Sequence, residues 1–219
     1  MKFKYALLDM DGTLIDSMEL WNGVAARFLA KYNIIPDPSI VDELKYLTLN
    51  TSPGLFKKKY NLEIDEEQIY QELIVIVMQI YGNEMLPKPG AVNLIEYLYK
   101  NKIEMYIATA NDREPTESAL RCIGIYDKIK KIYICDEVGY NKRERIFFEK
   151  VLQDIGCEKD EIVLFEDALH SIETAKSMGI KIVAIEEKTF ADERDEIERL
   201  ADIYCESFDE IVLDGSLLK

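Results

Sequence analysis

The chain has 219 residues, of which 48% are hydrophobic and 32% are charged, and its formal net charge is −15 at pH 7. This composition is typical of a soluble globular protein, with either one domain that carries an insertion or two small domains. The strong negative charge argues against nucleic acid as a partner, because binding to phosphate backbones needs basic patches.

Two further features indicate where the protein works. The apolar run near the N-terminus is too short for a signal peptide or a membrane span. The four cysteines are widely spaced and form no CxxC pair, which is typical of reduced thiols. We therefore expect a cytoplasmic monomer that does not act at a membrane.

The first predicted strand covers residues 5–8, a continuous apolar run that is typical of a strand buried on both faces. Asp9 and Asp11 follow it directly, and Gly12 supplies a turn that few other residues tolerate. Chemistry in an open α/β sheet lies just outside the carboxyl ends of the strands. Two acids there could hold a divalent cation, and one of them could attack an electrophile. The alternative is a surface turn or a fragment of a calcium loop.

Residues 16–86 show helical periodicity and no strand pattern. The first helix should end near Tyr32, and further helices are expected over residues 39–47, 53–60 and 65–81. The sequence Pro-Lys-Pro-Gly at residues 87–90 then marks a boundary, because proline fixes the chain direction and cannot continue a helix. These patterns predict a helical domain over residues 16–86, inserted into a core domain of residues 1–15 and 87–219.

From residue 91 onward, predicted helices and strands alternate. Strands are expected over residues 104–109, 132–135, 162–165 and 181–185, and helices over residues 91–100, 114–122, 143–155, 171–178 and 192–200. Repeated βα units of this kind predict an α/β fold with a parallel sheet that helices cover on both faces.

Polar residues follow several of these strands at their carboxyl ends. Thr109 ends one strand and precedes Ala110 and Asn111, and Glu166 and Asp167 end another. A lysine, Lys142, lies between them at the start of a predicted helix. Parallel strands bring their carboxyl ends to one rim of the sheet, so these groups should join the two N-terminal aspartates. Together they match a metal-assisted phosphoryl-transfer site.

Two segments carry motifs that are specific enough to indicate a family. Residues 9–17 read Asp-Met-Asp-Gly-Thr-Leu-Ile-Asp-Ser, and residues 165–180 begin Phe-Glu-Asp-Ala-Leu-His-Ser. With Thr109 and Lys142 between them, they resemble the haloacid dehalogenase superfamily, in its phosphatase and β-phosphoglucomutase branch with a helical cap after the first strand. The likeness covers the whole chain. It implies a Rossmann-like three-layer α/β core with a parallel sheet, plus an all-helical cap domain.

The resemblance also implies roles for the acidic residues. Asp9 would be the nucleophile that forms an aspartyl-phosphate, and Asp11 the general acid and base. Magnesium would bind Asp9, the Asp11 backbone carbonyl and Asp167, with Glu166 beside it. The partner would be a small phosphorylated metabolite.

The remaining rim residues would bind the phosphoryl group. Thr109 and the nearby backbone of Ala110 and Asn111 would hold its oxygens, and Lys142 would stabilise their charge and keep Asp9 ionised.

Each of these assignments has a simpler alternative. Lys142 could be a solvated surface lysine, since Arg143 stands where the family usually has proline, and Thr109 could be an ordinary strand residue. Glu166 could be an acid at a helix start beside a single metal ligand. His170, the only histidine, is expected at a solvated loop position rather than as an acid or base.

The cap sequence bears on the reaction. Trp21 stands where the mutases of this branch have a histidine that aligns the general acid, and residues 46–49 lack their phosphate-gripping arginine. These differences favour hydrolysis of a small phosphate monoester. Trp21, Thr48, Asn50 and Lys57 are candidates for lining the substrate pocket. A mutase, a phosphonatase-like enzyme with a cap lysine, and a non-catalytic binding module remain alternatives.

Overall fold

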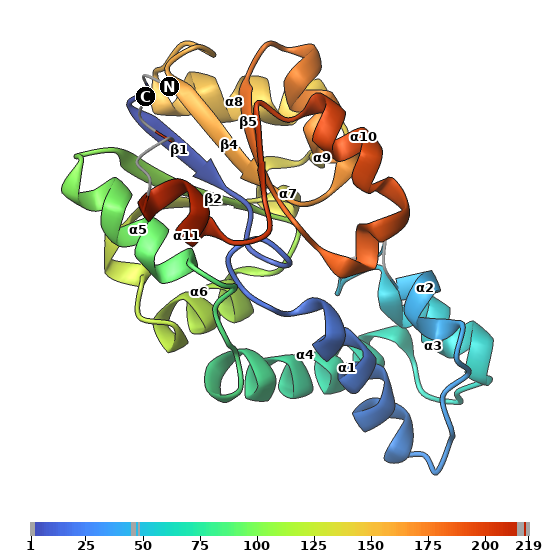
Figure 1. Ribbon diagram of the computed structural model, residues 1–219. Coiled ribbons are helices and arrows are strands. Elements are labelled where there is room, and N and C mark those ends of the chain that lie inside the picture. Colours follow the sequence, from blue (N-terminus) through green and yellow to red (C-terminus); the bar gives the residue numbers. More distant parts are fainter. Residues whose placement is uncertain (1–2, 45–46, 48, 214–216, 218–219) are drawn as a thin grey trace.

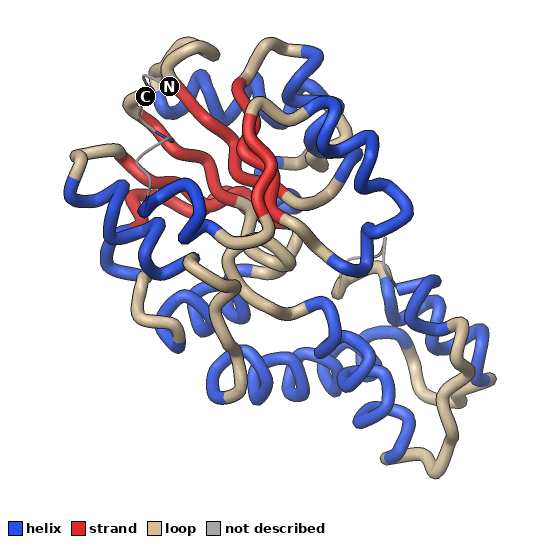
Figure 2. Tube along the Cα trace, in the orientation of Figure 1, coloured by secondary structure: helices blue, strands red, loops and turns tan. Residues whose placement is uncertain are grey.

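In the computed structural model of the chain, residues 3–44, 47, 49–213 and 217 are described. Within them a parallel sheet of six strands has the order β3-β2-β1-β4-β5-β6. The sheet lies at the centre of the molecule with helices on both sides (Figures 1 and 2). Its strands are β1 (Tyr5–Leu8), β2 (Glu104–Thr109), β3 (Ile129–Ile134), β4 (Ile162–Glu166), β5 (Lys181–Ile185) and β6 (Ile203–Cys205).

Two hydrophobic clusters cover the two faces of the sheet. Ala6 and Leu8 of the central strand β1 belong to one cluster, and Leu7 between them belongs to the other. Successive side chains of a strand point to opposite faces, so an uninterrupted apolar run suits a strand buried on both sides. The first cluster includes helices α5 (Ala91–Lys100), α6 (Arg113–Cys122) and α11 (Phe208–Leu213), and the second includes α8 (Arg145–Ile155), α9 (Leu169–Ser177) and α10 (Arg194–Leu200). The predicted three-layer α/β fold is confirmed.

The sequence missed the smallest elements. Strand β6 has three residues and pairs only with β5, through contacts such as Val183 with Ile203. A run this short carries no periodicity, so its extended conformation depends on that pairing. Short helices that were not predicted are α7 (Cys135–Val138), α11 and the 3-10 turns over Tyr126–Lys128 and Lys188–Glu193.

The helical insertion has the expected helices. They are α1 (Met18–Ala30), α2 (Ile40–Leu44), α3 (Ser52–Tyr60) and α4 (Glu66–Asn83), and the described residues between 18 and 83 contain no strand. The Asp65 carboxylate caps α4 by accepting a hydrogen bond from the backbone N–H of Gln68 at 2.7 Å. Helix α2 is shorter than predicted, and residues 45–46 of its expected end lie outside the described part. We call α1 to α4 the cap.

The cap joins the core through two neighbouring segments. The backbone N–H of Asp16 donates to Leu86 O, and that of Lys88 donates to Leu14 O, both at 2.9 Å. The predicted domain limits, residues 16 and 86, fall at this pair of segments and stay a prediction. Figure 1 shows the cap at the end of the sheet where the strands finish, so it covers the rim that carries the predicted site.

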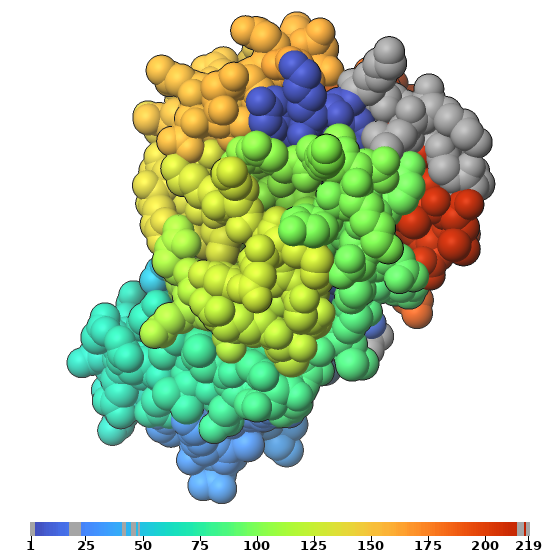
Figure 3. Space-filling model, turned by 90° about the vertical axis from the view of Figure 1, so that its left-hand side faces the viewer, coloured from blue at the N-terminus to red at the C-terminus, as the bar shows by residue number. Residues whose placement is uncertain are grey.

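Helix α4 holds the cap against the core. It packs along α6, and a Cβ added to Gly82 would lie 3.0 Å from the Ser118 hydroxyl oxygen. Figure 3 shows the teal residues of the cap lying directly against the yellow-green residues of the core. Among the described helices, none is long and apolar enough to cross a membrane.

Candidate active site

The loop after β1 brings two distant segments together. The backbone N–H of Asp9 donates to Phe165 O at 2.9 Å, and Leu14 and Ile15 both donate to Met10 O. Gly12 has a φ of +84°, and a Cβ there would lie 2.3 Å from Asp167 Oδ2. Glycine is therefore required both by the backbone conformation and by the close approach of the Asp167 carboxylate.

Lys142 lies at the centre of a buried cluster of charges. Its Nζ donates to Asp9 Oδ1 at 2.5 Å and to Glu166 Oε2 at 2.9 Å, and these side chains are 7%, 6% and 1% exposed. The alternative of a solvated surface lysine is wrong. Helix α8 begins only at Arg145, so Lys142 lies on the preceding loop rather than at a helix start.

Protein donors occupy the Glu166 carboxylate fully. Besides Lys142, Oε2 accepts from Ser171 Oγ at 2.6 Å, and Oε1 accepts from the backbone N–H groups of Asp167 and Ala168. Glu166 is the last residue of β4, and α9 begins three residues later at Leu169, so Glu166 is not the N-cap residue of that helix. Burial raises the pKa of Glu166, but Lys142 outweighs burial and holds that pKa below its usual value. The contribution of Ser171 was not predicted.

Asp167 is fixed by a hydroxyl from the first motif. Thr13 Oγ1 donates to Asp167 Oδ1 at 2.8 Å, and both side chains are buried. The sequence placed Thr13 in the motif but gave it no role. Its position between the turn glycine and the first cap segment was the available signal.

The acidic residues at this rim suit a cation. One carboxylate oxygen each from Asp9, Glu166 and Asp167 lies within 4.8 Å of the others. Burial and Glu166 raise the pKa of Asp9 to about 7, and burial and Asp9 raise that of Asp167 well above its usual value. Asp9 Oδ2 is buried and accepts no hydrogen bond from the described residues. Three carboxylates share the charge of one lysine, so a divalent ion that prefers oxygen ligands fits here.

Asp11 points away from this cluster. Its Oδ1 accepts a hydrogen bond from the Tyr81 hydroxyl of the cap, and its Oδ2 accepts from Asn111 Nδ2 at 3.2 Å. Burial raises the pKa of Asp11, and these hydrogen bonds oppose the shift. A raised pKa suits a group that must carry a proton at neutral pH. Tyr81 ends the apolar face of α4, where a sequence pattern indicates only packing.

The loop after β2 lies beside Asp11. Thr109 is buried, and its Oγ1 accepts from the backbone N–H of Asn111 at 3.1 Å, which leaves the hydroxyl hydrogen available for donation. Ala110 is exposed, and Asn111 Oδ1 accepts from the backbone N–H of Asp112. Two side-chain oxygens therefore hold the backbone of this loop in place next to Asp11.

The predicted cap residues are only partly placed. Asn50 Nδ2 donates to Asp112 Oδ1 at 3.1 Å and to Asp136 Oδ2 at 2.8 Å, so this cap loop touches the rim. Lys57 lies on α3 and is partly buried. Thr48 and the side chain of Trp21 lie outside the described residues.

His170 is not on a solvated loop. It lies in the first turn of α9 and is partly buried, and burial lowers its pKa to about 4. The expected position is therefore wrong. A neutral imidazole at this place does not supply positive charge to an anionic substrate at neutral pH.

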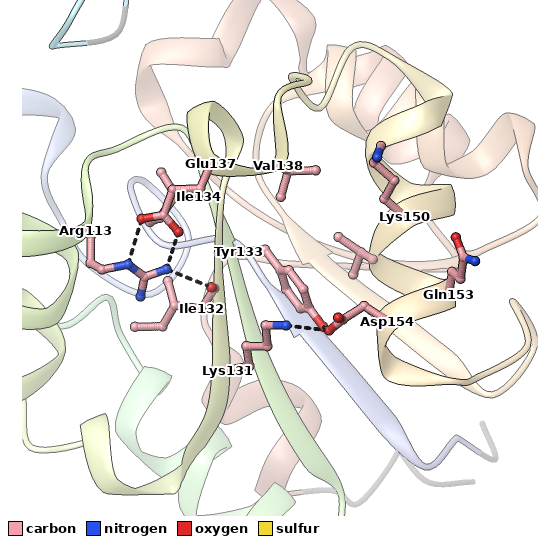
Figure 4. Close-up of a pocket in the computed structure, with 11 residues that line it drawn as sticks. Arg113, Lys131, Ile132, Tyr133, Ile134, Glu137, Val138, Lys150, Gln153 and Asp154 are labelled. Atoms are coloured by element: carbon pink, nitrogen blue, oxygen red, sulfur yellow. Dashed lines mark hydrogen bonds and ion pairs between the residues drawn. The ribbon is translucent and has the colours of Figure 1, made fainter.

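A cavity of about 600 Å³ at the edge strand β3 is separate from the rim (Figure 4). Two ion pairs cross it, from Arg113 Nε to Glu137 at 2.7 Å and from Lys131 to Asp154 at 2.7 Å. None of the described candidate residues at the rim lines it. Two of the cations that line the cavity therefore already have acidic partners, whereas a third lining cation, Lys150, lies over the Tyr140 ring.

Comparisons with known proteins agree with this geometry. The chain is 23% identical over 190 residues to the validoxylamine A 7'-phosphate phosphatase of Streptomyces hygroscopicus subsp. limoneus, covering 84% of this chain and 85% of that protein. Its fold matches CbbY of Rhodobacter sphaeroides in complex with phosphate (TM-score 0.78, 20% identity, 95% and 96% covered). It also matches the β-phosphoglucomutase of Clostridium difficile (TM-score 0.72, 17% identity, 99% and 100% covered). A family model described as haloacid dehalogenase-like hydrolase matches residues 6–185, and the chain therefore belongs to this family.

Proposed function

We propose that this protein is a magnesium-dependent phosphatase that hydrolyses a small phosphate monoester, such as a sugar phosphate, through an aspartyl-phosphate on Asp9. One observation carries the proposal. The buried Asp9 carboxylate is held through Oδ1 by Lys142, and its Oδ2 accepts no hydrogen bond from the described residues. A carboxylate oxygen of Asp167 lies within 4.8 Å of one from Asp9. The name of the phosphatase relative and the bound phosphate of CbbY support a phosphorylated substrate.

The reaction takes two displacements at phosphorus. An Asp9 carboxylate oxygen attacks the phosphorus, and the bond from phosphorus to the ester oxygen breaks as Asp11 gives that oxygen a proton. Water then attacks the phosphorus of the aspartyl-phosphate and gives a proton back to Asp11. Inorganic phosphate leaves, and the Asp9 carboxylate is restored.

Other residues of the rim hold the transferred group. Lys142 and the Thr109 hydroxyl would donate to the phosphoryl oxygens, together with the backbone N–H group of Ala110. The backbone N–H of Asn111 donates to Thr109 Oγ1 and would hold that hydroxyl in place. Donors fixed in advance in a buried site stabilise developing charge better than mobile water does. Lys142 also lowers the pKa of Asp9, against the effects of burial and Glu166, and so favours the ionised form that can attack.

Asp9 and Asp167 are the side chains best suited to bind magnesium, with the backbone carbonyl of Asp11. Bound magnesium would offset the repulsion between the Asp9 carboxylate and the anionic substrate. Glu166 is assigned a different role, because four protein donors already use its oxygens. We infer that Glu166 holds Lys142 in place rather than binding the ion directly.

Phosphorus NMR with glucose 1-phosphate and smaller monoesters tests the proposal. We expect inorganic phosphate to appear with magnesium, to stop appearing with EDTA, and to be suppressed when calcium replaces magnesium. Calcium prefers longer bonds and more ligands, which spoils the alignment for attack. Full activity in metal-free buffer would contradict the metal-assisted reaction. Formation of glucose 6-phosphate faster than phosphate release would instead show a mutase.

A further inference from the structure

The side chain of Asp11 is held at both oxygens by residues from different parts of the chain. Its Oδ1 accepts from the Tyr81 hydroxyl, and its Oδ2 accepts from Asn111 Nδ2 at 3.2 Å. Asn111 belongs to the loop after β2, whereas Tyr81 lies in the last turns of cap helix α4, 70 positions away from Asp11. Asp11 therefore lies between the core and the cap.

Tyr81 is fixed where it stands. Its side chain is 1% exposed, and it belongs to the hydrophobic cluster that also contains Val77 and Ile80 of the same helix. The next residue, Gly82, is in close contact with Ser118 of α6. A tyrosine buried in this way offers its hydroxyl in one direction, so its hydrogen bond sets the direction of the carboxylate rather than following it.

The two hydrogen bonds also set the orientation of the carboxyl group. The Tyr81 hydroxyl holds Oδ1 on the side of the cap. Oδ2 lies on the side of Asn111 and of the loop that would bind the phosphoryl group. Tyr81 therefore keeps Oδ2, rather than Oδ1, on the side of the rim.

We propose that Tyr81 is a positioning residue that aligns Asp11 for protonation of the leaving oxygen. The inference rests on the proposed phosphatase function, since it assigns a task within that reaction. In the mutases that the sequence resembles, the aligning residue is a histidine on the first cap helix, where this chain has Trp21 instead. The structure assigns this task to the last cap helix instead, beside the segment that returns to the core.

Removal of the Tyr81 hydroxyl tests the proposal through the leaving group. In Tyr81→Phe we expect kcat/KM to fall about tenfold for phenyl phosphate, whose leaving oxygen needs a proton. For p-nitrophenyl phosphate, whose leaving group departs without one, we expect a loss below about threefold. Thermal unfolding should show that the variant is folded.

Tyr70→Phe is the matched control. Tyr70 is also on α4 and also donates a hydrogen bond to a core aspartate, Asp112, at 3.3 Å, but it does not touch Asp11. We expect this variant to change kcat/KM for both substrates by less than about twofold, because a long, part-buried hydrogen bond that does not touch Asp11 contributes little net free energy. If the substitutions only weakened the packing of the cap against the core, both variants would lose activity alike on both substrates.

A double variant shows whether Tyr81 acts through Asp11. In the Asp11→Asn background the leaving oxygen receives no proton from residue 11, so adding Tyr81→Phe should cause no further loss beyond about twofold. Equal losses on both phenyl esters in the single variant, or an additive loss in the double variant, would overturn the inference and leave the phosphatase intact. Absence of phosphate release by the wild type from either ester would instead remove the proposed function.

Discussion

Two polar clusters meet at the rim of the sheet, and they differ in how much free energy it costs to break their hydrogen bonds and ion pairs. The buried cluster consists of Asp9, Lys142 and Glu166, whose side chains are at most 7% exposed. The interface cluster consists of Asn50, Asp112 and Asp136, in which a cap amide donates to two core carboxylates at the surface. The first cluster comes from core elements alone, whereas the second joins the core to the cap.

This difference separates two tasks. Removing one partner from a buried group of charges is costly, because the remaining charges stay out of water. Breaking a hydrogen bond at the surface costs little, since water replaces the lost partner. The buried cluster is therefore suited to chemistry that needs fixed geometry, and the interface cluster to a cap that opens and closes over the substrate.

The largest effect is expected at Asp9. In Asp9→Asn the neutral amide cannot attack phosphorus, and turnover should fall by at least roughly a thousandfold. The fold should persist, because Glu166 still pairs with Lys142 and one of three crowded carboxylates is removed. Phosphate release and thermal unfolding measure the two properties separately. Residual activity within tenfold of the wild type would remove Asp9 from the role of nucleophile.

The second effect concerns the stability of the buried cluster. Lys142→Met keeps the unbranched aliphatic shape of the side chain but removes the charged end, which leaves the two buried carboxylates without a cation, so the free energy of unfolding should fall by about 3 kcal/mol. Lys131→Met is the control, since Lys131 pairs with Asp154 at 2.7 Å with side chains 50% and 47% exposed. This variant should change stability by less than about 0.5 kcal/mol. If chemical denaturation gave similar losses of unfolding free energy for the two variants, the distinction between the buried and exposed pairs would be contradicted.

The sequence predicted the family and the fold because those features depend on local patterns. The run at residues 5–8 and the repeated βα units each reveal a strand or helix without knowledge of its neighbours. The family model that matches residues 6–185 confirms the family that the motif around Asp9 and Asp11 indicated. The location of the site at the rim could also be predicted, since the carboxyl ends of parallel strands share one edge of the sheet.

Contacts between distant segments were not predictable in the same way. Ser171 holds Glu166, and Tyr81 holds Asp11, but each looks like an ordinary helix residue in the sequence. The role of such a hydroxyl group can be recognised only once the fold shows which carboxylate it contacts. The same limit explains strand β6, whose three residues take their conformation from β5. The roles that we assign to these residues at the site therefore remain proposals, which the variants described here would test.

The smallest effect is expected at the interface cluster. Asn50→Ala removes the hydrogen bonds to Asp112 and Asp136, and both carboxylates are then free to take up water. At an exposed interface this should shift the ratio of open to closed cap by about 1 kcal/mol, or about fivefold. The cap should move about the neighbouring segments 15–17 and 86–88, so X-ray scattering without ligand should give a larger radius of gyration than for the wild type. With a metal fluoride as phosphate analogue the two proteins should converge, because ligand binding favours the closed state.

Asn93→Ala provides the matched control for this last comparison. Asn93 also donates to an aspartate at the surface, Asp209 at 2.7 Å, but both residues belong to the core. Its replacement should leave the scattering curve unchanged, with and without the analogue. If the cap of the wild type were equally closed in both states, and Asn50→Ala behaved like Asn93→Ala, the interface cluster would have no part in closure. The cap would then be a fixed wall of the site, and water would have to enter without its movement.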